Sequence, residues 1–115
     1  MLLRLCYGSR SFLFTGDAGF QAEEAIVRGL HETDVLKVGH HGSRFSTSPE
    51  FLKKLNPSLA VISVGRYNSF GHPTNEVLEN IEVSGAVCKR TDKNGAVEVW
   101  TDGKNLSVRS YIDKD

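Results

Sequence analysis

The sequence predicts an α/β fold built on a mixed sheet, and two observations indicate this class. Short apolar segments typical of strands alternate with segments whose apolar residues recur at helical spacing, in the order β-β-α-β-α-β-α-β-β-β. The dipeptides Asn94-Gly95 and Asp102-Gly103, both typical of tight turns, separate the last three strands. We therefore expect three helices and a mixed sheet that ends in an antiparallel meander.

A hairpin is expected at the start of the chain, followed by an amphipathic helix. Residues 2–7 and 11–14 form its strands, on either side of a turn at Gly8-Ser9-Arg10. Glu23 and Glu24 lie near the start of the helix, where the helix dipole favours acidic side chains. The helix spans residues 21–31, and its expected apolar face consists of Ala22, Ala25, Ile26 and Leu30.

The middle of the chain predicts two more strands and two more helices. Residues 34–38 form a strand that ends at the turn-prone run 39–43, and residues 59–64 are apolar enough for a strand covered on both faces. Ser48 and Pro49 favour the start of a helix, with Ser48 as the N-cap. The third helix opens at residues 73–76 and ends at Ser84-Gly85. The remaining strands are expected at residues 86–91, 96–101 and 106–112.

Length and charge narrow the functional classes. The chain has 115 residues, which fits one domain, 1–115, with a real core. It has 14 basic and 14 acidic residues, and neither half of the chain is a basic tail. Because non-specific affinity for nucleic acid depends on the phosphates that Lys and Arg neutralise, this balance argues against a module held on DNA by bulk electrostatics.

Apolar segments and cysteines give expectations about location and redox state. No segment approaches the roughly 18 apolar residues of a membrane-spanning helix, and residues 1–6 are too short for a signal peptide. We therefore expect a cytoplasmic protein whose own segment makes no membrane contact. Cys6 and Cys88 have no CxxC spacing, which favours two buried strand thiols over a disulfide framework.

Three loops that follow predicted strands carry the residues best suited to chemistry. They are Thr15-Gly16-Asp17, His40-His41-Gly42-Ser43 and Phe70-Gly71-His72-Pro73, and they contain three of the four histidines. Ligands of α/β proteins usually bind at the carboxyl ends of strands. Imidazole and carboxylate groups bind zinc and related metals, which activate water for hydrolysis. Because the loops are far apart in sequence, their proximity depends on the predicted fold.

Simpler roles for the same residues stay open at this point. Asp17 can serve as a helix cap or turn residue, His40 and His41 can be solvated on their glycine-flanked loop, and His72 can cap the helix after Pro73. His31 lies near a helix end, where a cation suits the dipole. A serine nucleophile is disfavoured because the chain has no Gly-x-Ser-x-Gly elbow.

Five segments in this order resemble a known family. They are 12–17, 36–43, 48–52, 60–65 and 67–73, which include the TGD, GHHGS and FGHP runs. The pattern resembles the metallo-β-lactamase superfamily and, within it, the soluble domain of ComEC-type DNA-uptake (competence) proteins and their free-standing hydrolase relatives. The resemblance extends from about residue 3 to residue 103.

The resemblance implies a site as well as a fold. It implies an αβ/βα sandwich that binds two metal ions, usually zinc and sometimes manganese or iron. Asp17 would bridge the metals and His72 would bind the second one. His40 and His41 take the position of either a ligand or a hydrogen-bond donor to the transition state. We therefore expect metal ligands at Asp17, His72 and His41, catalytic roles for His40 and His41, and substrate contacts at Ser43 and Arg66.

One departure from the family pattern limits these expectations. The family's most characteristic motif, His-x-His-x-Asp-His, does not occur in the chain, whose histidines are 31, 40, 41 and 72. We therefore expect the C-terminal half of such a domain, with zinc or manganese bound weakly or not at all and little activity alone. The parent activity would be metal-dependent hydrolysis of a phosphodiester, DNA included, or of a related ester.

The same departure predicts a partner. An N-terminal half of the same fold, or a second copy of the chain, would cover the face that is apolar in the parent fold. The alternative function is a non-catalytic, homodimeric binding or structural module derived from this fold.

Overall fold

The computed structural model describes residues 3–16, 19–26, 29, 31–42, 46–65 and 72–112, and of His40 and His41 it describes the backbone. The first half contains β1 (Leu3–Tyr7), β2 (Arg10–Phe14), α1 (Phe20–Ile26), β3 (Val35–Lys37), the 3-10 turn η2 (Gly39–Gly42) and α2 (Pro49–Leu55). The second half contains β4 (Leu59–Ile62), α3 (Asn75–Ser84), β5 (Val87–Arg90), α4 (Thr91–Asn94), β6 (Val97–Thr101) and β7 (Leu106–Ser110).

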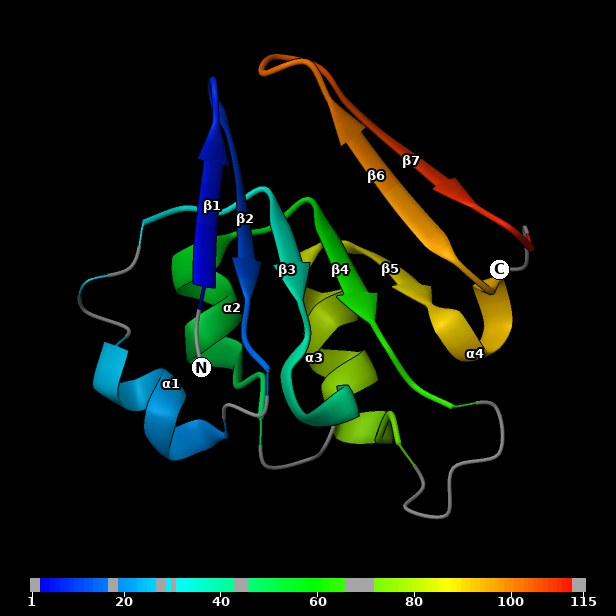
Figure 1. Ribbon diagram of the computed structural model, residues 1–115. Coiled ribbons are helices and arrows are strands. Elements are labelled where there is room, and N and C mark those ends of the chain that lie inside the picture. The colour runs from blue at the N-terminus through cyan, green and yellow to red at the C-terminus, as the bar shows by residue number, and fades with distance from the viewer. Residues whose placement is uncertain are drawn as a thin grey trace.

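The described strands form a five-stranded mixed sheet and a separate hairpin. The main sheet has the order β1-β2-β3-β4-β5, in which β1 is antiparallel to β2 and the other neighbours are parallel. The antiparallel pair β6 and β7 leans over one side of this sheet, while α2 and α3 lie on the other (Figure 1). The predicted mixed α/β class is thus confirmed.

The end of the main sheet differs in detail from the predicted meander. Residues 87–90 pair in parallel with β4, so the antiparallel part contains two strands. Asn94-Gly95 ends the short helix α4 in place of the expected hairpin turn. The Asn94 side chain explains this, because it accepts a 2.8 Å hydrogen bond from the Arg90 N–H and donates one of 3.2 Å to the Ile112 carbonyl. Tertiary bonds therefore override the local turn preference.

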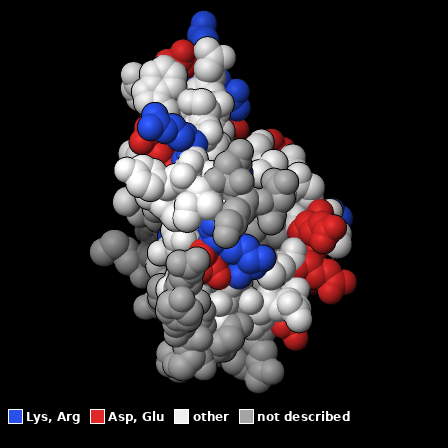
Figure 2. Space-filling view, turned by 90° about the vertical axis from the view of Figure 1, so that its right-hand side faces the viewer, with Lys and Arg blue, Asp and Glu red and all other residues white. Residues whose placement is uncertain are grey.

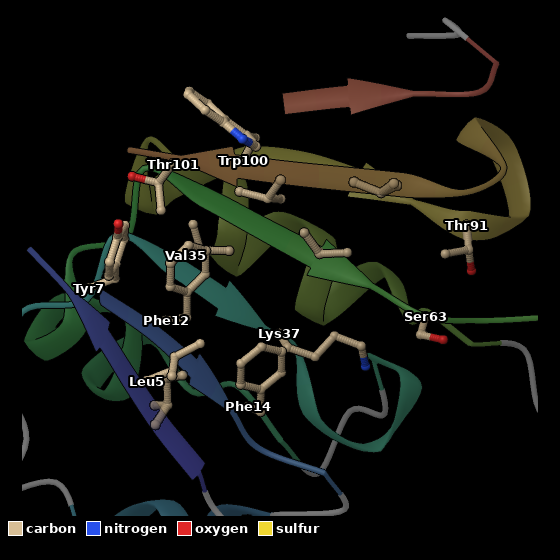
Figure 3. A pocket seen from close by; sticks show the side chains of 14 residues that line it. Leu5, Tyr7, Phe12, Phe14, Val35, Lys37, Ser63, Thr91, Trp100 and Thr101 are labelled. Carbon is tan, nitrogen blue, oxygen red and sulfur yellow. The ribbon is translucent and has the colours of Figure 1, made fainter. Parts of the chain in front are cut away.

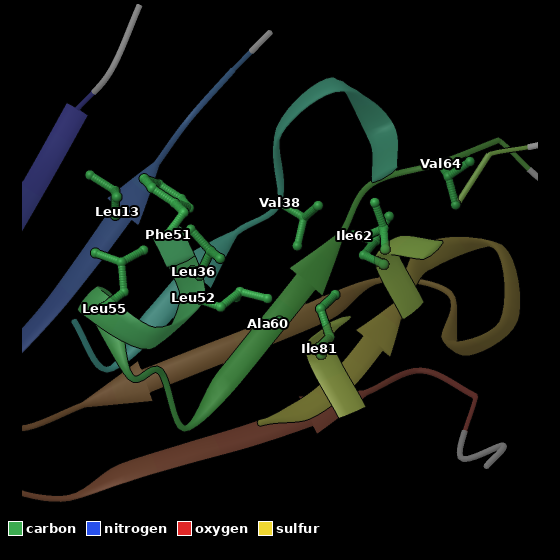
Figure 4. Packing of buried hydrophobic residues seen from close by; sticks show 11 residues of the cluster. Leu13, Leu36, Val38, Phe51, Leu52, Leu55, Ala60, Ile62, Val64 and Ile81 are labelled. Carbon is green, nitrogen blue, oxygen red and sulfur yellow. The ribbon is translucent and has the colours of Figure 1, made fainter. Parts of the chain in front are cut away.

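The core lies between the main sheet and the helices α2 and α3. Strand residues alternate in direction, and the set that faces the helices is buried. Helix α2 begins as predicted, because the Ser48 side chain accepts a hydrogen bond from the Phe51 N–H. The cluster shown in Figure 4 comprises Leu13, Leu36, Val38, Phe51, Leu52, Leu55, Ala60, Ile62, Val64 and Ile81, together with Val77.

The opposite face of the sheet is apolar and open. Here Leu5, Phe12 and Phe14 project from β1 and β2, and β6 forms a second wall (Figure 3). Together they line a cavity of about 670 Å³. Leu5 is 52% exposed, Tyr7 59% and Trp100 57%, so much of this apolar surface faces solvent.

The tip of the β6–β7 hairpin is fixed to the turn between β1 and β2. The carbonyl oxygen of Gly103 accepts hydrogen bonds from the Ser9 N–H at 2.7 Å and from the Ser9 hydroxyl at 2.8 Å. A Cβ on Gly8 would lie 2.5 Å from the same oxygen, so this close approach requires glycine. The two turns therefore close one end of the apolar cavity.

Two burial predictions are wrong. Cys6 is exposed, because β1 is an edge strand and the Cys6 side chain lines a polar surface pocket with Ser9 and Ser11. In α1, Ala25 is exposed, whereas Glu23 is buried. None of the helices within the described ranges is long and apolar enough to cross a bilayer.

Candidate functional site

The candidate site lies at the carboxyl ends of β2, β3 and β4. Because these strands are parallel, the segments that leave them emerge at the same edge of the sheet (Figure 1). Thr15-Gly16 follows β2, and the η2 turn follows β3 after Val38. These are two of the three loops that the sequence singles out.

A hydrogen bond joins the first two loops at their base. The buried Thr15 hydroxyl donates to the Lys37 carbonyl oxygen at 2.5 Å. One residue further on, the Val38 N–H donates to the Val61 carbonyl at 2.8 Å. The ends of β2, β3 and β4 are therefore held in register where the candidate residues begin.

The third loop is fixed directly to η2. The Thr74 N–H donates to the Gly42 carbonyl at 2.9 Å, and the Thr74 hydroxyl lies 3.2 Å from the same oxygen. Gly42 has φ +83°, and a Cβ there would lie 2.5 Å from the Pro73 Cβ. The half-buried His72, next to Pro73, thus belongs to a segment packed against the turn that contains His40 and His41.

A buried carboxylate supports the segment after η2. The sequence predicted only that this acidic residue lies near the start of a helix. Glu23 is 2% exposed, and its carboxylate oxygens accept hydrogen bonds from the N–H groups of Thr47 and Ser48. Burial raises the pKa of Glu23 above its usual value, although the two N–H donors act in the opposite direction. Its spacing offered a signal, since Glu23 lies three residues before Ile26 on one helix face.

One basic residue at this edge is described. Lys37 is half-buried and lines the apolar cavity with Phe14, Val61 and Ser63 (Figure 3). Its ammonium nitrogen lies 3.5 Å from the Val38 carbonyl, close to the start of η2. A cation is thus present where the sheet meets the candidate loops.

The described charges on one side of the molecule are mixed in sign. The side seen in Figure 2 carries basic and acidic side chains with uncharged surface between them. Arg90 and Asp92, two positions apart in the sequence, form an ion pair with a 2.7 Å contact between Nη2 and Oδ2. This described surface does not resemble a continuous basic track for a nucleic-acid backbone.

Comparison with known proteins decides the family. The model of the metallo-beta-lactamase superfamily matches residues 1–66, which include β1 to β4, the Thr15-Gly16 segment and the GHHG turn. The chain belongs to this superfamily.

Three curated proteins are similar to most of this superfamily chain. It is 39% identical over 93 residues to "ComE operon protein 3" of Bacillus subtilis, covering 79% of this chain and 12% of that protein. It is 40% identical over 92 residues to "Recombination protein 2" of Haemophilus influenzae, covering 80% and 12%. With "Competence protein ComA" of Neisseria gonorrhoeae, identity is 38% over 100 residues, covering 84% and 14%. The predicted resemblance to ComEC-type proteins is confirmed, and the chain spans only a small part of their length.

Most predicted site residues of this metallo-β-lactamase-like chain stay predictions. Asp17, Ser43 and Arg66 lie outside the described residues, and His40 and His41 are placed by backbone alone. His72 is described, on the segment bonded to Gly42. Among the side chains that the structure describes, no three His, Cys, Asp or Glu gather to hold a metal.

The donor types suit the metal ions that this superfamily usually binds. Imidazole nitrogens and a carboxylate fit zinc, and the Thr74–Gly42 bond brings two of the three candidate segments together. The sequence predicts three donors, Asp17, His72 and one histidine of η2, a number that would suit a single ion and would be too few for a two-metal centre.

Proposed function

We propose that this chain supplies one half of a metal-dependent hydrolase site of the ComEC type. In this proposal Asp17, His72 and His41 or His40 bind a zinc or manganese ion weakly. The substrate is a phosphodiester, DNA included, or a related ester. The observation that carries the proposal is the pair of contacts from Thr74 to the Gly42 carbonyl, because they hold the His72 segment against the histidine turn.

The chain's own residues would divide the chemistry among them. When bound, the ion supplies a water of lowered pKa and neutralises negative charge on the reacting centre. The η2 histidine that is not a ligand would protonate the leaving oxygen or donate a hydrogen bond to the developing oxyanion. Lys37 and Arg66 would pair with phosphate oxygens, and the Ser43 hydroxyl would donate to one of them.

We propose that full activity needs a second half. The chain has no His-x-His-x-Asp-His run, and metal affinity depends on ligand number and on the groups that orient the ligands. The exposed apolar face formed by Leu5, Tyr7 and Phe14 supports a partner that packs there. Residues 1–115 would thus be the C-terminal half of a domain whose N-terminal half covers this face.

The same apolar face supports a second candidate function. Two copies of the chain could pair through it and form a homodimeric binding or structural module without catalysis. Light scattering separates the candidates, because a 12.7 kDa monomer at high micromolar concentration would exclude the homodimer. A dimer that binds no zinc would favour the structural module.

Zinc titration followed by histidine NMR tests the proposed site. We expect the ring resonances of His72 and of His40 or His41 to shift, with His31 unchanged. His31 is a suitable control because it precedes β3 at the opposite edge of the sheet, where its carbonyl lies 3.4 Å from the Arg4 guanidinium. Equal shifts at all four histidines, or none, would reject the site.

Hydrolysis of bis-p-nitrophenyl phosphate tests the need for a second half. We expect little or no turnover by the 115-residue chain with zinc or manganese. Metal-dependent turnover that disappears in Asp17→Ala would show that the chain is a complete enzyme, and would contradict this part of the proposal.

A further inference from the structure

Glu23 is a buried acid that the proposed chemistry does not use. It lies in α1, six residues after Asp17 in the sequence, and is 2% exposed. Burying a carboxylate is costly unless hydrogen bonds compensate it. Glu23 meets this condition across 24 and 25 residues of sequence, by accepting from the N–H groups of Thr47 and Ser48.

The segment that Glu23 holds is unusual in conformation, and two of its residues, Ser46 and Thr47, are buried. Thr47 is 1% exposed and has φ +58°, a left-handed conformation that is unfavourable for a non-glycine residue. The Asn80 amide donates to the Thr47 carbonyl at 3.2 Å, so both backbone polar groups of Thr47 have partners. A conformation of this kind persists where surrounding contacts determine it.

A short series of bonds leads from this segment to the histidine turn. The buried Ser46 hydroxyl donates to the Gly39 carbonyl at 3.1 Å and lies 3.3 Å from the Thr47 hydroxyl oxygen. Gly39 is the first residue of η2 and directly precedes His40. The carboxylate of Glu23 is therefore linked to η2 through Thr47 and Ser46.

The chemistry of the contact requires a carboxylate. The N–H groups of Thr47 and Ser48 each donate to a different oxygen of Glu23, and the Ser48 side chain is also hydrogen-bonded to it, so a side chain with two acceptor oxygens suits the contact. A glutamine would present one oxygen and turn its own N–H₂ group toward the second donor. Any other polar substitution would leave a buried N–H group without its partner.

We infer that Glu23 is a positioning residue, which fixes the Ser46–Ser48 segment and thereby the η2 turn with His40 and His41 relative to the start of α1. Its effect on metal binding rests on the proposed function. Its effect on the position of the turn does not.

The variants Glu23→Gln and Glu24→Gln test the inference. Glu24 is the neighbouring glutamate and is exposed. It has the same charge as Glu23 and lies in the same helix, but it lacks the buried contacts of Glu23. Leu55→Ala, at the far end of α2 from Ser48, controls for general loss of stability. Three readouts are compared: amide hydrogen exchange at Thr47 and Ser48, the ring resonances of His40 and His41, and zinc affinity by competition with a chromophoric chelator.

We expect Glu23→Gln to speed exchange at Thr47 and Ser48 at least tenfold, to shift the His40 and His41 resonances, and to weaken zinc binding by about three- to tenfold. Glu24→Gln should change none of these, and Leu55→Ala should lower stability without selective changes at these positions. Unchanged exchange and histidine resonances in Glu23→Gln would overturn the inference. If the unsubstituted chain binds no zinc, the proposed function fails, while exchange and resonances still decide the role of Glu23.

Discussion

The Thr74 N–H donates a 2.9 Å hydrogen bond to the Gly42 carbonyl, across 32 residues of sequence. On the same side, the α-carbon of Gly42 faces Pro73 so closely that no side chain fits between them. The loop with His72 and the turn with His40 and His41 therefore form one packed unit. The family match ends at residue 66, before this unit is complete.

Replacement of Gly42 by alanine should disrupt this unit. The new Cβ would lie 2.5 Å from the Pro73 Cβ and 2.9 Å from its Cα, and the φ of +83° is unfavourable for alanine. We expect the free energy of unfolding to fall by about 3 kcal/mol, of which about 1 reflects the backbone conformation and the rest overpacking. Urea denaturation measures the loss, and the His72 resonances should shift.

Gly85→Ala is the matched control for Gly42→Ala. Gly85 has φ +86°, and a Cβ there would have no neighbour within 4 Å. We expect a loss of about 1 kcal/mol from the conformation alone. Equal losses in the two variants would mean that the contact with Pro73 contributes nothing.

Glu23 should give stability a distinctive pH dependence. Because burial raises its pKa above 4.5, the folded chain keeps this proton to higher pH than the unfolded chain does. The contribution of Glu23 to stability is therefore largest below pH 4.5, falls as pH rises from 4.5 through the folded-state pKa, and is constant above it. We expect the difference in unfolding free energy between the wild type and Glu23→Gln to follow this course in urea titrations from pH 4 to 8.

The exposed Glu24→Gln variant controls for the loss of one charge on α1. If the wild type instead gained stability relative to Glu23→Gln as pH rises, the pH dependence would have the opposite sign to the one expected. That result would show that the N–H groups of Thr47 and Ser48 outweigh burial in setting the pKa of Glu23.

Local patterns in the sequence predicted the ends of helices correctly where a single residue determines the end. Ser48 and Pro49 start α2, and Gly85 ends α3 in a left-handed conformation, as expected. Asn94-Gly95 was misread because the Asn94 side chain binds Ile112, which is distant in sequence. The parallel pairing of β5 with β4 likewise depends on tertiary contacts, which no local pattern specifies.

The candidate site could be predicted as a set of loops but not as an arrangement. Strand order places the Thr15-Gly16 segment and η2 at one edge, and this followed from the alternation of strands and helices. The contacts that hold them, from Thr15, Thr74 and Glu23, are between residues more than 20 positions apart. The sequence predicted Glu23 only as an acidic residue near a helix start. Its burial could not be predicted, because it depends on contacts with segments that are distant in sequence.

The apolar face should determine how strongly the chain binds an apolar dye and associates with other copies. Leu5 and Tyr7 project into a partly open cavity from the edge strand β1. Leu5→Lys should reduce the fluorescence of bound anilinonaphthalene sulfonate and any concentration-dependent association seen by light scattering. Val83→Lys is the control, since Val83 is 80% exposed on α3, which packs on the other face of the sheet. Equal effects of both variants would argue against a specific apolar docking face.

The hairpin tip should be held in place by Ser9. Its N–H and hydroxyl both donate to the Gly103 carbonyl, and Arg10 Nε donates to the neighbouring Lys104 carbonyl at 2.6 Å. Ser9→Ala removes one of these bonds, which should lower stability by about 1 kcal/mol and speed amide exchange in β6 and β7. Trp100 reports on the change, because its environment beside the apolar cavity depends on hairpin position, and its emission should shift to longer wavelength. Ser58→Ala, at an exposed position just before β4, is the control and should leave emission and exchange unchanged. A Ser9→Ala variant with the same behaviour would show that the remaining contacts hold the hairpin without the hydroxyl.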